Sequence, residues 1–402
     1  MAFQFGIDHL LNQPALVKRL KSARVGLIAH PASITGDNKH TLDALIEAGC
    51  NITKAFGPQH GMRGDKQDNM VESPDYLDPF HGIPVISLYG EHRKPTTEML
   101  ADLDIVLFDL QDIGCRIYTY ITTLFYFCES CAESGIELWV LDRPNPAGRP
   151  VDGTFLEAGA ESFVGCARIP TRHGLTVGEL ALYFNSLLAG KLDQQIISMK
   201  DYHCDTGPGY GWPVQERHWI NPSPNASSLN MARCFPGTVL LEGTNLSEGR
   251  GTTIPLEVVG APELPVHEIL EALRRDFTES IMGAILRPNY FSPTFHKHSG
   301  KLCTGLQIHT EYPKYQHNVF KPYRLIAGFL KALRRLVPDY DMWRHHEYEY
   351  ELDRIPIDVI NGGPWLRVWV DDNNQGYADL DRALEKTTSE WQKIRAPYLI
   401  YP

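Results

Sequence analysis

The sequence contains no run of ~18 consecutive apolar residues, which excludes a typical membrane-spanning helix. Its first residues also lack a basic segment followed by an apolar core, so no signal peptide is visible. We therefore expect a cytoplasmic protein without a membrane span, or an exported protein if a leader has been removed.

Basic residues are in the minority, because 38 Lys and Arg stand against 49 Asp and Glu and leave a net charge of −11. Proteins that bind nucleic acid usually present a cationic surface, so we predict no nucleic-acid partner. Cysteine is sparse, and its scattered positions are typical of free buried thiols in a reducing compartment. For the single C-x-x-C pair, Cys128 and Cys131, we favour core packing over redox or zinc chemistry.

Motifs that bind cofactors are missing as well. The chain has no H-E-x-x-H, no P-loop, and no G-x-G-x-x-G after the first predicted strand. We predict that no metal or nucleotide cofactor is needed, and we expect the histidine pairs at 296/298 and 345/346 to lie in surface loops. The oligomeric state is not indicated.

Apolar strands alternate with helices over the first half of the chain. Strands are predicted at 25–30, 52–56, 84–89, 104–110 and 137–141, with helices at 41–48 and 117–134 between them. This alternation predicts an α/β fold, a Rossmann-like doubly wound and mainly parallel sheet covered on both faces. After residue 255 amphipathic helices dominate. Because 402 residues suit two domains, we predict a Rossmann-like catalytic domain at 1–235 and a smaller α+β domain at 236–402.

Polar strings follow four of these strands, at residues 57–64, 89–93, 109–118 and 142–146. In open parallel sheets, ligands bind beyond the carboxyl ends of the strands, so we predict the active site there. Each string also has a structural interpretation, since Asp142 and Arg143 can form an internal ion pair and the glycines can serve tight turns. In the second half, residues 242–252 are predicted either to cradle an anion through backbone N–H groups and Arg250 or to form a turn between domains.

Together these strings resemble one known family. They are FGPQHGMRG (56–64), SLYG (87–90), DLQDIGCRIYTY (109–120), LDRPNP (141–146), HGLTVGELA (173–181), NPSPN (221–225) and EGTNLSEGRGT (242–252). They resemble the NamZ-like exo-β-N-acetylmuramidases, glycoside hydrolase family 171, over essentially the whole length. The resemblance implies a cleft between two domains and the release of terminal N-acetylmuramic acid from peptidoglycan fragments, in cell-wall turnover or recycling.

One position departs from the family's pattern, which usually has Glu directly before the His as the expected catalytic carboxylate. Gln59 stands there in this chain. An amide cannot donate a proton to a leaving oxygen, and glycoside hydrolysis ordinarily uses two carboxyl groups. Another acid can serve, and by motif we nominate Asp112 and Glu248, with His60 positioning or sharing the proton. Alternatively the substrate's acetamido group assists, with Gln59 orienting it, or catalysis is lost and a muramyl-sugar binding protein remains. A hydrolase of another bond in the same substrate class is a further alternative.

Muramic acid carries a lactyl carboxylate, which Arg is suited to bind in a bidentate manner. Arg63, Arg116, Arg143 and Arg250 lie in the relevant strings, and we expect at least one to contact that group unless all pair with neighbouring Asp residues. Tyr89, Tyr118, Tyr120 and Trp212 are candidates for stacking on a sugar ring, or belong to the core. The full set of predicted substrate-binding residues is Arg63, Tyr89, Arg116, Tyr118, Asp142, Arg143, Asn145, His173, Asn225, Asn245 and Arg250.

Overall fold

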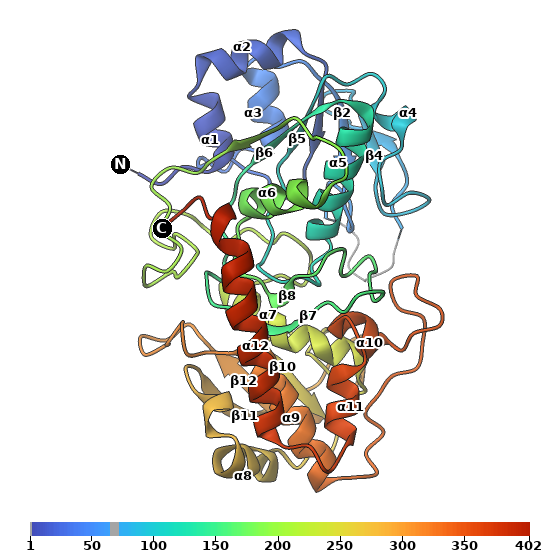
Figure 1. The fold of residues 1–402 in the computed structure, drawn as a ribbon, viewed down its shortest axis with the longest axis vertical. Helices are drawn as coiled ribbons and strands as arrows, with labels where there is room; N and C mark the ends of the chain where they lie inside the picture. Colours follow the sequence, from blue (N-terminus) through green and yellow to red (C-terminus); the bar gives the residue numbers. More distant parts are fainter. Residues whose placement is uncertain (1, 65–71) are drawn as a thin grey trace.

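A computed structural model of the chain describes residues 2–64 and 72–402. Two lobes are stacked along the longest axis of the molecule (Figure 1). The first lobe is built around a seven-stranded sheet, and the second around a three-stranded sheet. A two-stranded sheet of β7 (Asp152–Phe155) and β8 (Pro170–Arg172) lies between them.

The sheet of the first lobe has the order β3-β4-β2-β1-β5-β6-β9. All neighbouring strands are parallel except β3, which runs antiparallel to β4. This confirms the predicted α/β class. The strands are β1 (Val25–Ile28), β2 (Ile52–Gly57), β3 (Tyr76–Leu77), β4 (Pro84–Ser87), β5 (Ile105–Phe108), β6 (Glu137–Leu141) and β9 (Gln194–Ile197).

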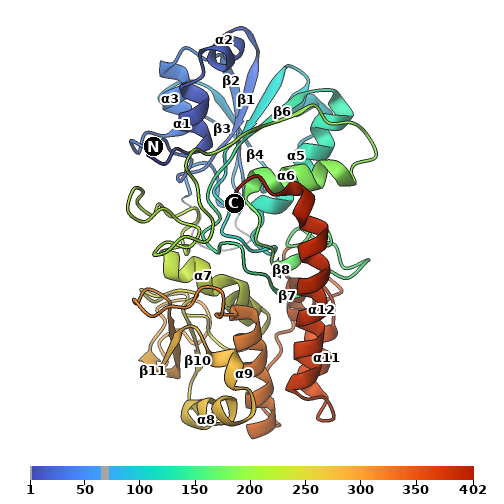
Figure 2. The ribbon, with the colours of Figure 1, turned by 60° about the vertical axis from the view of Figure 1, so that its left-hand side comes forward.

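Helices cover both faces of this sheet (Figure 2). Leu27 belongs to one buried cluster and Ile28 to another, because successive strand residues point to opposite faces. The cluster around Leu27 includes residues of α1 (Gly6–Leu11), α2 (Pro14–Ser22) and α3 (Thr41–Glu47). The cluster around Ile28 includes residues of α4 (Thr97–Leu100), α5 (Tyr120–Ser134) and α6 (Val177–Leu187).

Local signals place most helix ends where the sequence predicts them. Gly135 ends α5 with a left-handed φ of 67°, and Thr176 and Glu179 form a capping box at the start of α6. Helix α5 begins at Tyr120, three residues later than predicted from the apolar pattern. The preceding residues are held elsewhere, since Arg116 donates its backbone N–H to Thr171. Cys128 and Cys131 are buried in α5, as core packing requires.

The second lobe is α+β. Its antiparallel sheet has the order β10-β12-β11, formed by Val258–Ala261, Cys303–His309 and Ile285–Phe291. Around it lie α7 (Leu229–Thr238), η1 (Val239–Gly243), α8 (Val266–Asp276), η2 (Thr278–Ile281), α9 (Pro322–Leu336), α10 (Pro356–Asn361), α11 (Trp365–Asp371) and α12 (Tyr377–Arg395), followed by η3 (Ala396–Tyr398). Helix α7 runs through residue 235, and the domain division at that residue stays a prediction.

The sheet order positions the site. Strand β1 has β2 on one side and β5 on the other. The chain therefore first continues outward from β1 through β2, and later returns to add β5 on the opposite side of β1. In doubly wound sheets a crevice opens at such a point, beyond the carboxyl ends of the strands. The second lobe lies beyond this end of the sheet (Figures 1 and 2). Side chains of the two lobes meet there, since Gln59 and Tyr89 hydrogen-bond to Glu349.

Candidate active site

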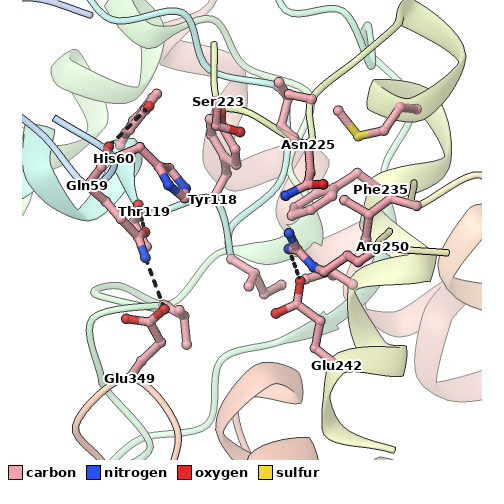
Figure 3. A pocket seen from close by; sticks show the side chains of 18 of the residues that line it. Gln59, His60, Tyr118, Thr119, Ser223, Asn225, Phe235, Glu242, Arg250 and Glu349 are labelled. Atoms are coloured by element: carbon pink, nitrogen blue, oxygen red, sulfur yellow. Dashed lines mark hydrogen bonds and ion pairs between the residues drawn. The ribbon is translucent and has the colours of Figure 1, made fainter. Parts of the chain in front are cut away.

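A pocket lies where the two lobes meet, with about 540 Å³ of empty space that includes the solvent at its mouth. Its lining from the first lobe includes Gln59, His60 and Thr119, and the second lobe adds Glu242, Arg250, Tyr348 and Glu349. Figure 3 shows Gln59 and Glu349 facing each other on one side, with Glu242 and Arg250 on the other. The pocket is therefore polar on both flanks, while Phe235, Met231, Ile113 and Val164 supply apolar surface.

Gln59 lies two residues after the end of β2 and is 5% exposed. The turn after it needs left-handed backbone, with φ of 70° at His60 and 75° at Gly61. The Thr119 hydroxyl donates to Oε1 of Gln59 at 2.7 Å, and Nε2 of Gln59 donates to Oε1 of Glu349 at 3.1 Å. Both ends of the amide are thus engaged, and its orientation is set by these two partners.

Glu349 reaches this site from a turn of the second lobe, 290 residues away along the chain. Its other oxygen accepts a hydrogen bond from the Tyr89 hydroxyl at 2.8 Å. Burial raises the pKa of the Glu349 carboxyl above its ordinary value, although the hydrogen bonds from Tyr89 and Gln59 act in the opposite direction. Glu349 is therefore a carboxyl group at the pocket wall that holds its proton more tightly than a solvated Glu.

The opposite flank carries an ionic network. Nη2 of Arg250 lies 2.6 Å from Oε1 of Glu242, and the Tyr348 hydroxyl donates to Oε2 of Glu242 at 2.7 Å. Behind the pocket, Nε of Arg250 is 3.3 Å from Glu248, whose other oxygen lies 2.6 Å from Nζ of Lys297. Arg250 is thus held by two carboxylates, and their charges raise its pKa despite burial.

Five of the predicted site residues line this pocket: Gln59, His60, Tyr118, Asn225 and Arg250. Tyr120, a predicted stacking residue, also lines it. The imidazole of His60 points toward Tyr118 in Figure 3. The structure therefore brings residues from the strings at 57–64, 109–120, 221–225 and 242–252 to one place, as expected for the carboxyl end of the sheet.

The two nominated acids, Asp112 and Glu248, are not among the lining residues. Asp112 is 2% exposed and accepts a hydrogen bond from the Gly114 backbone N–H at 2.6 Å. Glu248 is enclosed by Lys297, Arg250 and His296, and although burial opposes it, these charges lower the pKa of Glu248 to about 2. A carboxylate that ionises so readily carries no proton to donate at neutral pH.

Other predicted residues brace the sheet edge. Arg143 forms a buried two-point ion pair with Asp109, with Nε–Oδ1 and Nη2–Oδ2 distances of 2.5 and 2.9 Å. Asp142 accepts hydrogen bonds from Thr176, Gly178 and Tyr401, and burial raises its pKa to about 6. The internal ion pair considered for Arg143 thus exists, with Asp109 rather than Asp142 as its partner.

The remaining predicted residues also make contacts within the chain. Arg116 donates to the Asn361 carbonyl at 2.8 Å, and burial lowers its pKa to about 10. Side-chain nitrogens of Asn145 and Asn245 donate to backbone carbonyls of Leu175 and Asp341. The other three are His173, which is fully buried 3.5 Å from Asp112, Trp212, which is buried beside Trp219, and Arg63, which is exposed with its guanidinium 4.6 Å from the centre of the Tyr76 ring.

Sequence reasoning missed Glu242, Tyr348 and Glu349. Glu242 lies within the string at 242–252, in which Glu248 is the predicted acid. Tyr348 and Glu349 belong to HHEYEYE at 345–351, a segment outside every predicted helix and strand. Its alternation of acidic and aromatic residues is the signal that could have identified it, because loops that carry such residues are common binding elements.

Two further observations concern the described residues only. Within 2–64 and 72–402, no three His, Cys, Asp or Glu side chains are grouped so that they could hold a metal ion. The lack of a cofactor requirement stays a prediction. None of the helices in these ranges combines the length and apolar character needed to cross a bilayer.

Comparison with known proteins matches two family models. Residues 25–230 match "Exo-beta-N-acetylmuramidase NamZ, N-terminal", and residues 233–401 match the C-terminal counterpart. The peptidoglycan beta-N-acetylmuramidase NamZ of Bacillus subtilis (strain 168) is 38% identical over 400 residues, which cover 99% of this chain and 91% of that protein.

Two crystal structures of DUF1343 family proteins from Bacteroides fragilis NCTC 9343 are also similar. One has a TM-score of 0.85 at 31% identity, and the other has 0.76 at 26%. Each match covers 100% of this chain and 99% of the other. The similarity therefore extends over both lobes.

Proposed function

The chain belongs to the exo-β-N-acetylmuramidase NamZ family, and on that premise we propose that it hydrolyses the bond linking a terminal N-acetylmuramic acid to the rest of a peptidoglycan fragment. The Bacillus subtilis relative is a peptidoglycan β-N-acetylmuramidase. Muramyl glycosides or muropeptides released during wall turnover are the corresponding substrates. The reaction class is glycoside hydrolysis.

The observation that carries this proposal is the pair of carboxyl groups at the pocket. Glu349 and Glu242 both line it, from different segments of the second lobe. Glycoside hydrolysis uses two carboxyl groups that flank the scissile bond, one as acid and one as a charged group. The apolar and aromatic lining between them suits the face of a sugar ring.

Arg250 supplies a candidate contact for the lactyl carboxylate. Of the four arginines nominated from the sequence, it is the one that lines the pocket. Its guanidinium is already held by Glu242 and Glu248, so its position is set before substrate arrives. A pre-positioned guanidinium binds a carboxylate without losing further side-chain entropy.

The direct test is turnover of an aryl N-acetylmuramide beside the matching N-acetylglucosaminide, with mass identification of the product from a disaccharide. We expect kcat/KM to favour the muramide by roughly tenfold to a hundredfold, the range of one charge-assisted hydrogen bond. Arg250→Lys should reduce that preference, because an ammonium lacks the guanidinium's fork. Arg275→Ala, on the exposed surface of α8, is the matched control.

The outcomes separate the alternatives. Muramide turnover with release of the intact sugar supports the proposal. Tight muramide binding with no product from any substrate would indicate a binding protein, and release of lactate would indicate a hydrolase of the ether bond.

A further inference from the structure

The turn at residues 348–351 joins the second lobe to the carboxyl end of the first lobe's sheet. Tyr348 and Glu351 pair at its base, while Glu349 accepts hydrogen bonds from Gln59 and Tyr89 of the first lobe. Next to it, the Arg93 guanidinium lies 3.6 Å from the centre of the Tyr350 ring. The turn is therefore held by contacts on both sides of the pocket, and Glu349 has a defined position.

The backbone of this turn is unusual. Glu349 and Tyr350 have φ values of 47° and 68°, so two successive non-glycine residues are left-handed. Left-handed backbone is unfavourable for residues with a Cβ atom, and it persists only where surrounding contacts impose it. The conformation sends the Tyr348 and Glu349 side chains into the pocket lining. Strain of this kind commonly accompanies a functional side chain.

The two carboxyl groups of the lining have different partners. A guanidinium and a phenol donate to Glu242, whereas an amide and a phenol donate to Glu349. Glu242 is paired with the Arg250 guanidinium, and burial raises the pKa of the Glu349 carboxyl. Carboxyl pairs whose environments differ in this way divide into a charged group and a proton donor.

The geometry points to Glu349 as the proton donor of this pocket, with Gln59 as the positioning residue that fixes its orientation; this assignment rests on the proposed function. The amide nitrogen of Gln59 can only donate, so Oε1 of Glu349 must accept, and the proton resides on Oε2. The Tyr89 hydroxyl beside Oε2 can either donate or accept, and it therefore tolerates both states of the acid. Gln59 therefore stands where the family usually has Glu, but its role is to orient Glu349 through a hydrogen bond, and this role needs no ionisable group.

The step balances as a hydrolysis. Glu349 donates its proton to the glycosidic oxygen as the C1–O bond breaks, and the bonding electrons leave with that oxygen. Water supplies a hydroxyl group to C1, and the remaining proton of that water returns to the Glu349 carboxylate. One water molecule is consumed, and the enzyme is restored.

A leaving-group comparison tests the assignment. A muramyl disaccharide has a sugar alkoxide as leaving group and needs protonation, whereas a 2,4-dinitrophenyl muramide does not. Glu349→Gln should lower kcat/KM on the disaccharide by roughly 100-fold or more, and on the dinitrophenyl substrate by less than about tenfold. Glu347→Gln, an exposed residue of the same segment, is the control and should leave both values unchanged.

The wild-type protein provides a second measurement that does not depend on the variant's folding. If Glu349 is the acid, kcat/KM on the disaccharide falls at alkaline pH, while the dinitrophenyl substrate shows no such fall. Equal losses on both substrates in Glu349→Gln, or the same alkaline limb on both in the wild type, would overturn the assignment. A wild type that turns over neither substrate would instead overturn the proposed function.

Discussion

The two lobes bring charged residues to their common pocket in different ways. At the carboxyl end of the sheet, the charged side chains of Asp109, Arg143 and Asp142 are occupied by partners within the first lobe. The second lobe contributes Glu242 and Glu349, which line the pocket itself. A strand end rich in charged residues is therefore not in itself a catalytic centre.

Asp109 and Asp142 are fully enclosed by the first lobe, whereas Glu242 and Glu349 border the pocket. A charge taken out of water must be paired or hydrogen-bonded, and the first lobe buries its charges deeply, with Asp109 and Asp142 fully buried. These pairs shape the sheet edge against which the second lobe packs. We expect substitutions in this set to change stability, and substitutions at the turn of residues 348–351 to change turnover.

The largest effect on stability is expected at the Asp109–Arg143 pair. Asp109→Asn leaves the Arg143 guanidinium buried without a counter-charge, which should lower the free energy of unfolding by ~3–5 kcal/mol. Urea unfolding measures this change, and kcat of the remaining folded protein should stay close to wild type. Asp104→Asn removes a charge from the exposed pair with Arg24 and is the control. It should unfold at the same urea concentration as the wild type. If Asp109→Asn and Asp104→Asn had the same free energy of unfolding, the stabilising role assigned to the buried Asp109–Arg143 pair would be wrong.

Glu248 is the next test, because it lies behind the pocket and braces Arg250. Its pKa of about 2, against an ordinary 4.5, means that the folded state favours the carboxylate. This contributes roughly 3–4 kcal/mol above pH ~4.5, and the contribution is lost as pH falls toward 2. Glu248→Gln should therefore be destabilised at neutral pH, with the difference from wild type narrowing in acid. Glu271→Gln, on the exposed side of α8, should show no such difference at any pH.

For Asp142 we expect stability to change with pH in the direction opposite to that for Glu248. Its pKa is raised from 3.8 to about 6, so the folded state binds the proton more tightly than the unfolded chain does. Wild-type stability should fall by up to about 3 kcal/mol as pH rises from ~4 to ~6. Asp142→Asn resembles the protonated acid and lacks this titration. We expect thermal unfolding to show that the melting temperature of the wild type falls relative to that of the variant as the pH rises across that range. If the melting temperatures of both proteins change with pH in parallel, Asp142 does not titrate there.

The smallest effect on stability is expected for Gln59→Glu, which restores the residue usual in the family. The new carboxyl would lie about 3.1 Å from Glu349, and two carboxyls so close share one proton. Activity should be retained or raised, and the alkaline limb of kcat/KM should move to higher pH because the shared proton is held more tightly. The pH–rate profile on the disaccharide checks this. An inert wild type made active by this change alone would favour the binding-protein interpretation.

Much of the first lobe could be predicted because its signals are local. The apolar run containing Leu27 and Ile28 is buried on both faces, as a central parallel strand requires. Gly135 and the Thr176 capping box end and begin helices through bonds to near neighbours. Gln59 and His60 are predicted at the site because they lie just beyond the end of a strand, and both line the pocket.

Asp112 and Glu248 were predicted as acids of the site, but neither of them lines the pocket. Both belong to strings that reach the pocket region, through Tyr118 and Arg250, but their own side chains turn away from it. Whether a carboxyl faces solvent or an internal partner depends on contacts such as Gly114 with Asp112 and Lys297 with Glu248. The sequence pattern contains the residue type but not the direction of the side chain.

The amino-acid sequence by itself determined five strands of the first lobe's sheet and their mainly parallel arrangement, because periodicity and chain order act over short distances. It also predicted the edge of the sheet at which a ligand would bind. Only the tertiary structure decided which carboxyl groups reach that edge. Glu349 meets Gln59 across 290 residues of chain, through the packing of one lobe on the other. Contacts of that separation depend on many burial and pairing interactions at once, and no local pattern encodes them.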